Sequence, residues 1–275
     1  MKSFSNAYIF VFSVIMVTIV AALLSVIALK LQPRQQMNIR IETMQSILKS
    51  VHVESTKRNA EELFNKYIVN SYVVNSEGEV IEGETALKVD LKKEVNKIDK
   101  IKKDQALIKE RRASPFKKFL NSFIKPKEID KDAVEKEIEA TKGERKLPVY
   151  ECQKDGQKYY VLPLRGKGLW GPIWGYVALE HDMNTIYGAV FDHKTETPGL
   201  GAEIKENWFQ KPFQGKQLYK DEEFISITVV KGGADASDIH GVDAISGGTI
   251  TSKGVQSMLF DCLASYESFF AIKRD

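Results

Sequence analysis

The chain has 275 residues, of which 43% are hydrophobic and 10% aromatic, which is typical of a globular protein and not of a disordered one. Its 40 basic and 37 acidic side chains leave a formal net charge of +3, so it lacks the basic excess that nucleic-acid-binding domains usually carry. The two cysteines and four scattered histidines do not have the spacing of a metal site. We therefore expect no nucleic-acid partner and no metal ligands.

The N-terminal part contains a long uncharged run at 7–29, which reads AYIFVFSVIMVTIVAALLSVIAL. About 20 apolar residues are enough to cross the hydrocarbon core of a bilayer as a helix. A cleaved signal peptide is the alternative, but the run is long and has no clear small-x-small cleavage site before Lys30. The pattern therefore predicts a short tail at 1–6 and an uncleaved transmembrane helix at 7–29.

The charges that flank this run bear on its orientation. Lys30, Arg34 and Arg40 follow the run, whereas Lys2 and the terminal amine precede it. Since basic residues accumulate on the cytoplasmic side of a membrane, this count alone favours a cytoplasmic C-terminal region.

The segment 30–147 is predicted to be a mostly helical linker that leads into the first part of a soluble domain. An apolar pattern with helical period runs through 38–70. Residues 71–83 then have the pattern of two short strands joined by a Ser-Glu-Gly turn at 76–78.

Residues 87–147 are dense in lysine and glutamate and predict a charged helical insertion exposed to solvent. An arm that binds a partner is the alternative. Within this stretch, Ser114 and Pro115 are typical of a helix start. The apolar face predicted for that helix consists of Phe116, Phe119, Leu120, Phe123 and Ile124.

The C-terminal half changes to strand patterns. Residues 147–152 and 158–164 flank an Asp-Gly pair, which favours the two-residue turn of a β-hairpin. Residues 173–180 and 224–231 predict two more strands, and apolar side chains recur at helical spacing from Lys253 onward. We therefore predict an α+β fold, with antiparallel strands packed against helices, beyond one N-terminal transmembrane helix.

Two features in this half have more than one interpretation. The glycines at 166, 168 and 171 match G-x-G-x-x-G, but Pro172 and a strand-like run follow them instead of the helix that a dinucleotide fold needs. We interpret them as a glycine-rich connection between strands. Cys152 and Cys262 could pair outside the cytoplasm, or each could be a buried apolar side chain.

The run Asp243-Ala-Ile-Ser-Gly-Gly-Thr249 leads directly into the C-terminal helix. The first N–H groups of a helix have no internal partner, and together with the helix dipole they favour a phosphate. The two glycines of the run let the backbone approach a ligand closely. An ordinary N-cap by Thr251 or Ser252 explains the same residue types, so physical reasoning leaves both interpretations open.

The run resembles the flavinylation motif of FMN-binding domains, Asp-x-x-Ser-Gly-Ala-Thr, with Gly248 at the position where that family usually has alanine. The whole chain resembles the C subunit of the sodium-translocating NADH:quinone reductase. Residues 168–176, 193–201 and 207–213 look like features of that family in the family's order, as does the N-terminal apolar run. The resemblance covers most of 148–275, which we expect to be the FMN-binding domain, and leaves 87–147 unmatched.

The resemblance implies that FMN is joined through its phosphate to the hydroxyl of Thr249. A separate flavin transferase would make this bond, with FAD as donor and magnesium present. Residues 196–200 resemble the loop that lies against the isoalloxazine ring in that family, whereas without the resemblance a simple Pro-Gly turn is the preferred interpretation. The further cofactor contacts that we expect are Asp243, Ser246, Gly247, Gly248, Thr251, Glu196, Thr197, Gly199, Leu200, Leu169 and Trp170.

The expected roles of these contacts differ. Asp243 and Ser246 would serve recognition and the phosphate loop, Leu200 would cover a face of the ring, and Thr197 would contact its polar edge. Leu169 and Trp170 are expected in the pocket wall, although a tryptophan in such a position is more often part of a core. No residue is expected to be catalytic.

The implied function is that of an electron-transfer subunit, which is not a complete enzyme alone. It would relay electrons from NADH towards quinone while the complex exports sodium. Its partners would be other subunits, the flavin transferase and membrane lipid. The family places the domain on the periplasmic side of the bacterial inner membrane, against the charge count.

Two alternatives remain. One is the G subunit of the related ferredoxin:NAD oxidoreductase complex, and the other is a membrane-tethered binding module without redox chemistry. The run 7–29 contains no carboxylate, so a sodium path through this helix alone is not expected.

Overall fold

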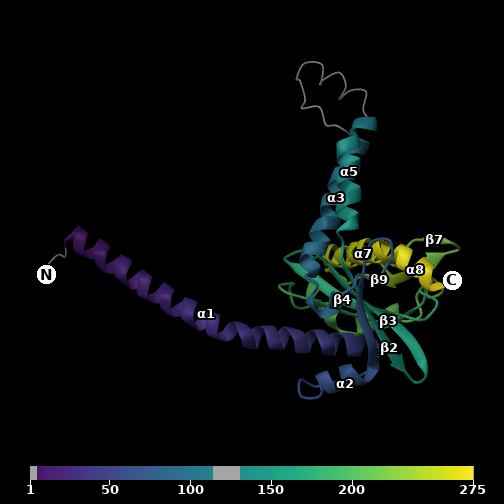
Figure 1. Ribbon diagram of the computed structural model, residues 1–275, viewed down its shortest axis with the longest axis horizontal. Helices are drawn as coiled ribbons and strands as arrows, with labels where there is room; N and C mark the ends of the chain where they lie inside the picture. The colour runs from purple at the N-terminus through teal and green to yellow at the C-terminus, as the bar shows by residue number, and fades with distance from the viewer. Residues whose placement is uncertain (1–4, 114–130, 275) are drawn as a thin grey trace. The chain divides into compact units, whose positions relative to one another are not determined.

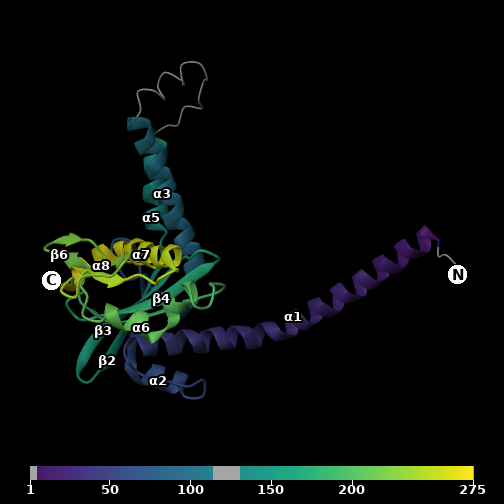
Figure 2. The same ribbon diagram turned by 180° about the vertical axis from the view of Figure 1, so that it is seen from behind.

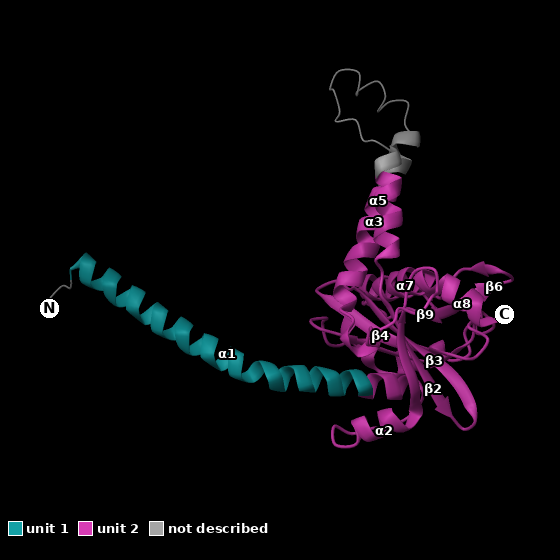
Figure 3. Cartoon of the chain, viewed as in Figure 1, with its two compact units in different colours: residues 1–44 teal, residues 45–275 magenta. Residues whose placement is uncertain are grey.

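The structure is a computed structural model that describes residues 5–113 and 131–274, without the side chains of 106–113 and 131–133. It divides into two compact units, Met1–Met44 and Gln45–Asp275 (Figure 3). The helix start expected at Ser114 and Pro115, and the apolar face expected after it, lie outside the described residues.

The long helix α1 (Asn6–Ser50) contains the predicted membrane span. An 18-residue window in it has a mean hydropathy of 2.8, and none of that window is buried against other residues. The hydroxyls of Ser13, Thr18 and Ser25 donate to carbonyls four residues earlier, each at 2.8 Å, so they leave no unpaired donor on the apolar surface. The helix is therefore consistent with membrane anchoring.

The helix predicted through 38–70 is interrupted. α1 ends at Ser50, where His52 adopts a left-handed backbone with φ 57°, and Val53 N donates back to Leu48 O at 2.9 Å. This arrangement closes the last turn of α1 in the manner of a C-cap, which a hydrophobic period does not reveal. The chain resumes helical structure only in α2 (Ala60–Tyr67) and then enters a strand.

A five-stranded antiparallel sheet in the order β1-β2-β3-β4-β5 forms the centre of the second unit, which confirms the predicted α+β fold. Its strands are β1 (Ile68–Val74), β2 (Leu147–Lys154), β3 (Gln157–Lys167), β4 (Pro172–Leu179) and β5 (Ile186–His193).

Of the two turns predicted with flanking strands, one joins two strands of the sheet and the other does not. The hairpin between β2 and β3 turns at Asp155 and Gly156, whose φ angles of 52° and 79° suit a two-residue turn, so this prediction is confirmed. The second strand expected before residue 83 is wrong, because only an isolated bridge from Val74 to Val80 forms there.

In the charged stretch between β1 and β2, the described residues 91–113 and 131–143 are helical, as predicted. After the short 3-10 turn η1 (Ala86–Lys88), the helices α3 (Leu91–Ala113) and α5 (Lys131–Gly143) run side by side and project from the sheet (Figures 1 and 2). We call this pair of helices the arm.

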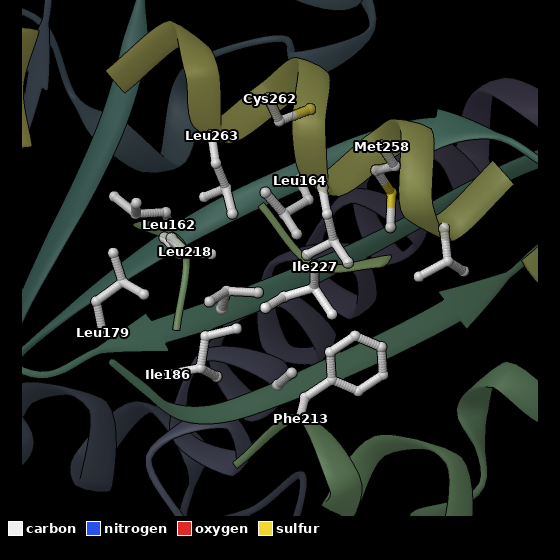
Figure 4. Packing of buried hydrophobic residues seen from close by; sticks show 14 of the residues in the cluster. Leu162, Leu164, Leu179, Ile186, Phe213, Leu218, Ile227, Met258, Cys262 and Leu263 are labelled. Carbon is white, nitrogen blue, oxygen red and sulfur yellow. The ribbon is translucent and has the colours of Figure 1, made fainter. Parts of the chain in front are cut away.

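The C-terminal helix α7 (Thr249–Leu263) lies across the sheet and closes the core. Figure 4 shows Met258 and Leu263 of α7 directed towards the sheet that carries Leu162 and Leu164, and all four side chains are buried. The 3-10 turn η4 (Ala264–Tyr266) and helix α8 (Glu267–Arg274) complete the chain. Burying this apolar stripe of α7 fixes the position of its first turn over the sheet.

The segment between β5 and α7 is less regular than predicted. It contains η2 (Gly201–Lys205), α6 (Asn207–Gln210), η3 (Lys211–Phe213), β6 (Tyr219–Lys220), β7 (Glu223–Phe224), β8 (Thr228–Val230) and β9 (Gly241–Asp243). The continuous strand expected at 224–231 is wrong, because Ser226 has a φ of 59° and both Ile225 N and Ser226 N donate to Leu218 O. β8 pairs in parallel with β9.

Two further interpretations are now decided. Cys152 on β2 and Cys262 on α7 are both free and buried, so they do not pair. Gly168 and Gly171 form the tight connection from β3 to β4, where Gly168 N donates to Gly171 O at 2.8 Å, and Gly166 is paired with Ile173 near the end of β3. The connection between strands is therefore confirmed.

Candidate flavin site

The first turn of α7 presents backbone donors that no helical carbonyl satisfies. The helix begins at Thr249 with Gly248 as N-cap residue, and the first N–H to reach back is that of Ser252, which donates to Gly248 O at 2.9 Å. The N–H groups of Thr249, Ile250 and Thr251 therefore have no partner within the helix. Together with the helix dipole, they form a place suited to an anion.

The capping explanation for this run is wrong, because both expected capping residues lie inside the helix. Ser252 Oγ accepts the N–H of Ile245 at 3.0 Å and so ties the preceding turn to the helix. Thr251 Oγ1 donates to Glu196 Oε2 at 2.6 Å. No side chain caps the helix start, so its free N–H groups stay available.

The turn before α7 depends on its two glycines. Gly247 has a φ of 74°, and a Cβ there would come 2.6 Å from Leu200 Cδ2. A Cβ at Gly248 would come 2.9 Å from Ile245 Cγ2 and 3.2 Å from the backbone carbon of Leu200. The missing side chains therefore let the Leu200 loop lie directly against the start of α7.

Glu196 joins three parts of the chain at this place. Its Oε1 accepts the N–H groups of Trp170 at 2.8 Å and Gly171 at 3.3 Å, while its Oε2 accepts the Thr251 hydroxyl. The residue is only 4% exposed. One carboxylate thus connects the β3–β4 connection, the loop after β5 and the first turn of α7.

The charge of this carboxylate is stabilised by its partners. Burial raises the pKa of Glu196, but the hydrogen bonds from Thr251, Trp170 and Gly171 lower it by more, so the pKa lies below its ordinary value of 4.5. Glu196 is therefore ionised at neutral pH.

His193, at the end of β5, fixes the backbone of the same residue. Its Nδ1 accepts the N–H of Glu196 at 3.2 Å, so in the neutral ring the proton lies on Nε2. Among the residues that the structure describes, the buried Nε2 has no hydrogen-bond partner. An unpaired buried donor beside a candidate ligand site is uncommon in a folded protein.

The loop that follows Glu196 is a tight turn. Leu200 N and Ala202 N both donate to Thr197 O at 3.1 Å, and Gly199 has a φ of 74°. The side chains of Thr197 and Leu200 are exposed, and Leu200 reaches the glycine pair before α7. The segment is therefore a Pro-Gly turn in its geometry, and it also faces the start of α7.

The expectation that Trp170 more often belongs to a core is wrong here. Trp170 is 66% exposed and Leu169 is 46% exposed, whereas their backbone is held by Glu196. Leu200 and Ile250 are also large, apolar and exposed. Free backbone donors and exposed apolar side chains therefore occur together at the start of α7.

Asp243 and Ser246 form no hydrogen bond with Glu196 or with the first turn of α7 among the described residues. Asp243 Oδ1 accepts the N–H of Ala234 at 2.7 Å, so the carboxylate holds the loop between β8 and β9. Ser246 is exposed in the turn that precedes Gly247. The structure thus gives Asp243 a local partner and leaves Ser246 at the surface.

A groove adjoins the start of α7 and was not predicted from the sequence. It has a volume of about 830 Å³ and lies between α3, the β3–β4 connection and α7. Asp99 and Asp261 also line it, and Asp261 pairs with Lys102. Its basic lining residues are Lys92, Arg165, Lys167, Lys194 and Lys253. The resulting field favours negative charge near the first turn of the helix.

Comparison with known proteins relates this geometry to a family. The model of the FMN-binding domain family matches residues 168–264, which include the β3–β4 connection, the loop after β5 and α7. The C subunit of the Na(+)-translocating NADH-quinone reductase from Vibrio alginolyticus is 31% identical over 234 residues, which are 85% of this chain and 81% of that protein. The chain belongs to this family, which we call the NqrC family. The alternative of the ferredoxin:NAD oxidoreductase subunit is thereby set aside.

Solved structures of the NqrC family share the fold. The protein from Parabacteroides distasonis is 36% identical with a TM-score of 0.66, and the match covers 87% of this chain and 96% of that one. The NqrC structure from Shewanella oneidensis is 29% identical with a TM-score of 0.61, covering 86% and 97%. The resemblance expected from the motifs is thus confirmed along most of the chain.

The residues at the start of α7 fit an FMN. The free N–H groups and the side-chain-free positions Gly247 and Gly248 suit a phosphate, and Leu200, Ile250 and Trp170 offer apolar surface for a flat ring. Among the described residues, no group of three or more His, Cys, Asp or Glu side chains is placed to hold a metal ion.

Several contributors were not found from the sequence. His193, Gly168 and Gly201 surround Glu196, and a Cβ at Gly168 or Gly201 would come 2.6 or 2.5 Å from its carboxylate oxygens. Their roles depend on contacts between segments that are far apart in the chain, so spacing carries no signal for them.

Proposed function

We propose that the chain carries FMN covalently, through its phosphate, on the hydroxyl of Thr249, and that it relays electrons from NADH towards quinone within a sodium-exporting complex. The chain's membership of the NqrC family and its FMN-binding domain support this proposal. When bound, FMN supplies the one- and two-electron chemistry, and the protein supplies binding and orientation.

The observation that carries the proposal is the contrast among the hydroxyls near the start of α7. Thr251 and Ser252 are each 1% exposed, and their hydroxyls are already hydrogen-bonded inside the protein. Thr249 is only partly buried and is the first residue of the helix, beside the free N–H groups. Its hydroxyl is therefore the one best placed to hold a phosphate that the helix start also binds.

Attachment needs help from outside the chain. A threonine hydroxyl is a weak nucleophile unless a base or a metal activates it. Within the described part of the chain, no side chain forms a hydrogen bond with the Thr249 hydroxyl, and Glu196 is engaged by Thr251. A separate flavin transferase that uses FAD and magnesium therefore accounts for the bond better than self-attachment does.

The other expected cofactor contacts fall into those for the phosphate and those for the flavin ring. The backbone of Gly247, Gly248 and Thr249 would cradle the phosphate, and Ser246 would add a hydroxyl from the turn. Leu200, Leu169 and Trp170 would pack on the ring, with Thr197 at its polar edge. Asp243 would act mainly by fixing the loop before the motif, because its carboxylate is bound to Ala234 N.

The attachment is tested by co-expressing the chain with a flavin transferase and examining the denatured protein. We expect in-gel flavin fluorescence and the added mass of FMN in the wild type and in Thr249→Ser. Thr249→Val has a similar shape without the hydroxyl and should lose both signals. Undiminished fluorescence in denatured Thr249→Val would refute attachment at this residue.

We further propose the arrangement in the membrane: an anchor at 7–29, a linker and arm at 30–147, and an FMN-binding domain at 148–275 on the periplasmic side of the inner membrane. The apolar part of α1 supports the anchor, and the family resemblance supports the side. Other subunits and membrane lipid would be its neighbours. Protease added to spheroplasts should remove the domain, and protection until lysis would contradict this orientation.

A further inference from the structure

Glu196 places a buried negative charge beside a site that suits a phosphate. Its two carboxylate oxygens accept hydrogen bonds from Thr251 Oγ1 at 2.6 Å and from Trp170 N and Gly171 N at 2.8 and 3.3 Å. Thr251 is two residues beyond Thr249, and Trp170 belongs to the apolar surface of the site. Glu196 therefore contacts both the first turn of α7 and the loop that carries Trp170.

The space around the carboxylate is closely fitted. A Cβ at Gly168 would lie 2.6 Å from Oε1, and a Cβ at Gly201 would lie 2.5 Å from Oε2. The N–H of Glu196 itself donates to His193 Nδ1 at 3.2 Å. The backbone and the side chain of Glu196 are thus both fixed, and the loops that contact them have little freedom to shift.

No basic side chain neutralises this charge in the part of the chain that the structure describes. The partners of the carboxylate are one hydroxyl and two backbone N–H groups. Lys167, Lys194 and Lys253 line the adjoining groove, but the described partners of the Glu196 carboxylate include none of them. The dipole of α7 contributes partial positive charge at the start of the helix, where it would interact with both the carboxylate and a bound phosphate.

We propose that Glu196 is a positioning residue for the flavin: it fixes the Trp170 and Leu200 loops against the first turn of α7, and its charge keeps the reduction potential of the bound flavin low. The proposal rests on the proposed function. Reduction adds negative charge to a flavin, and a nearby buried carboxylate opposes this because water screens buried charges weakly. Removing the charge should therefore make the flavin easier to reduce.

Two substitutions separate the two parts of this role. Glu196→Gln keeps the size of the side chain and removes its charge. Thr251→Val keeps the charge and removes one hydrogen bond, while Thr251→Ser keeps the hydroxyl. We call the β3–β4 connection at 168–171, the loop at 194–200 and the turn at 244–248 the flavin-site loops. Glu151→Gln is a matched control, because Glu151 is also a buried glutamate, and its partners Tyr72, Lys158 and Lys273 lie outside these loops.

The first measurement uses the full chain in detergent without flavin. Amide hydrogen exchange is measured at Trp170 and Gly171, whose N–H groups bind the carboxylate. We expect exchange at least tenfold faster in Glu196→Ala, which removes the acceptor of both N–H groups, and unchanged in Glu151→Ala. This measurement does not depend on flavin attachment, so it decides the positioning role even if a variant carries no FMN.

The second measurement is the midpoint potential of the flavinylated chain. Glu196→Gln should shift the reduction equilibrium at least tenfold towards the reduced flavin, which is about 30 mV for a two-electron couple. Thr251→Val should shift it much less, and Thr251→Ser and Glu151→Gln should match the wild type.

The outcomes distinguish this proposal from the one on which it rests. If wild-type protein carries no flavin after co-expression with the transferase, the proposed function fails. If wild type is flavinylated but Glu196→Ala has wild-type amide exchange, the positioning role is refuted. If the midpoint potential of Glu196→Gln equals that of wild type, the electrostatic role is refuted.

Discussion

The flavin-site loops and the arm both contain charged side chains, but they use them in opposite ways. At the start of α7, Glu196 is buried and its partners are backbone N–H groups and a hydroxyl. In the arm, Lys100 and Glu137 pair at 2.6 Å with about half of each side chain exposed to solvent. The Glu196 carboxylate is held by buried groups with fixed positions, whereas the Glu137 carboxylate is held by a flexible lysine side chain exposed to water.

This difference shows where the molecule requires a defined geometry. The loops around Glu196 approach one another through glycines whose Cβ atoms would collide with their neighbours. Among the described side chains of the arm, Ile98, Ile101 and Ile138 are buried, and Lys100 and Glu137 form an ion pair at the surface. A ligand site needs fixed positions, whereas a solvated helical pair needs only amphipathic helices.

The largest expected effect comes from adding one methyl group at Gly201, next to the flavin-site loops. Gly201→Ala would bring a Cβ within 2.5 Å of Glu196 Oε2, so we expect a loss of about 1–3 kcal/mol in the free energy of unfolding. It should also lower the flavinylated fraction. Urea unfolding of the full chain in detergent, with in-gel fluorescence, measures both.

Gly143→Ala is the matched substitution at the end of the arm helix α5. No atom lies within 4 Å of the added Cβ, so the free energy of unfolding should be unchanged or up to about 1 kcal/mol higher. Equal losses for the two substitutions would contradict the distinction between a fitted site and a solvated arm.

The same contrast explains which features the sequence could predict. The Asp155-Gly156 hairpin and the amphipathic α7 depend on neighbouring residues, so local patterns predict both of them. Thr249 is proposed from its motif, which is also a local pattern. The hydrogen bond between Glu196 and Thr251 joins residues 55 positions apart, and the kink at Ser226 depends on Leu218 O, so no local pattern predicts either one.

A second, smaller effect should follow pH. Because the pKa of Glu196 is depressed on folding, its contribution to stability is complete above the unfolded pKa and is lost as pH falls through the lower folded value. Glu196→Gln removes this contribution, so its deficit in unfolding free energy should be present at pH 7 and shrink below about pH 4.5. A deficit that stays constant down to pH 3 would show that the carboxylate does not titrate in this way.

The smallest effect is expected in the arm. Glu137 raises the pKa of Lys100, so the pair favours the folded state below the ordinary lysine value of 10.5 and loses this contribution as pH rises through the raised value. Both side chains are exposed, so salt should screen the attraction. We expect Lys100→Ala to change thermal unfolding only slightly at low salt and not at all in about 0.5 M salt, where the Debye length is roughly 4 Å. A loss that persists at high salt would mean that the arm, like the flavin site, depends on a fixed charge pair, and the comparison between the two regions would fail.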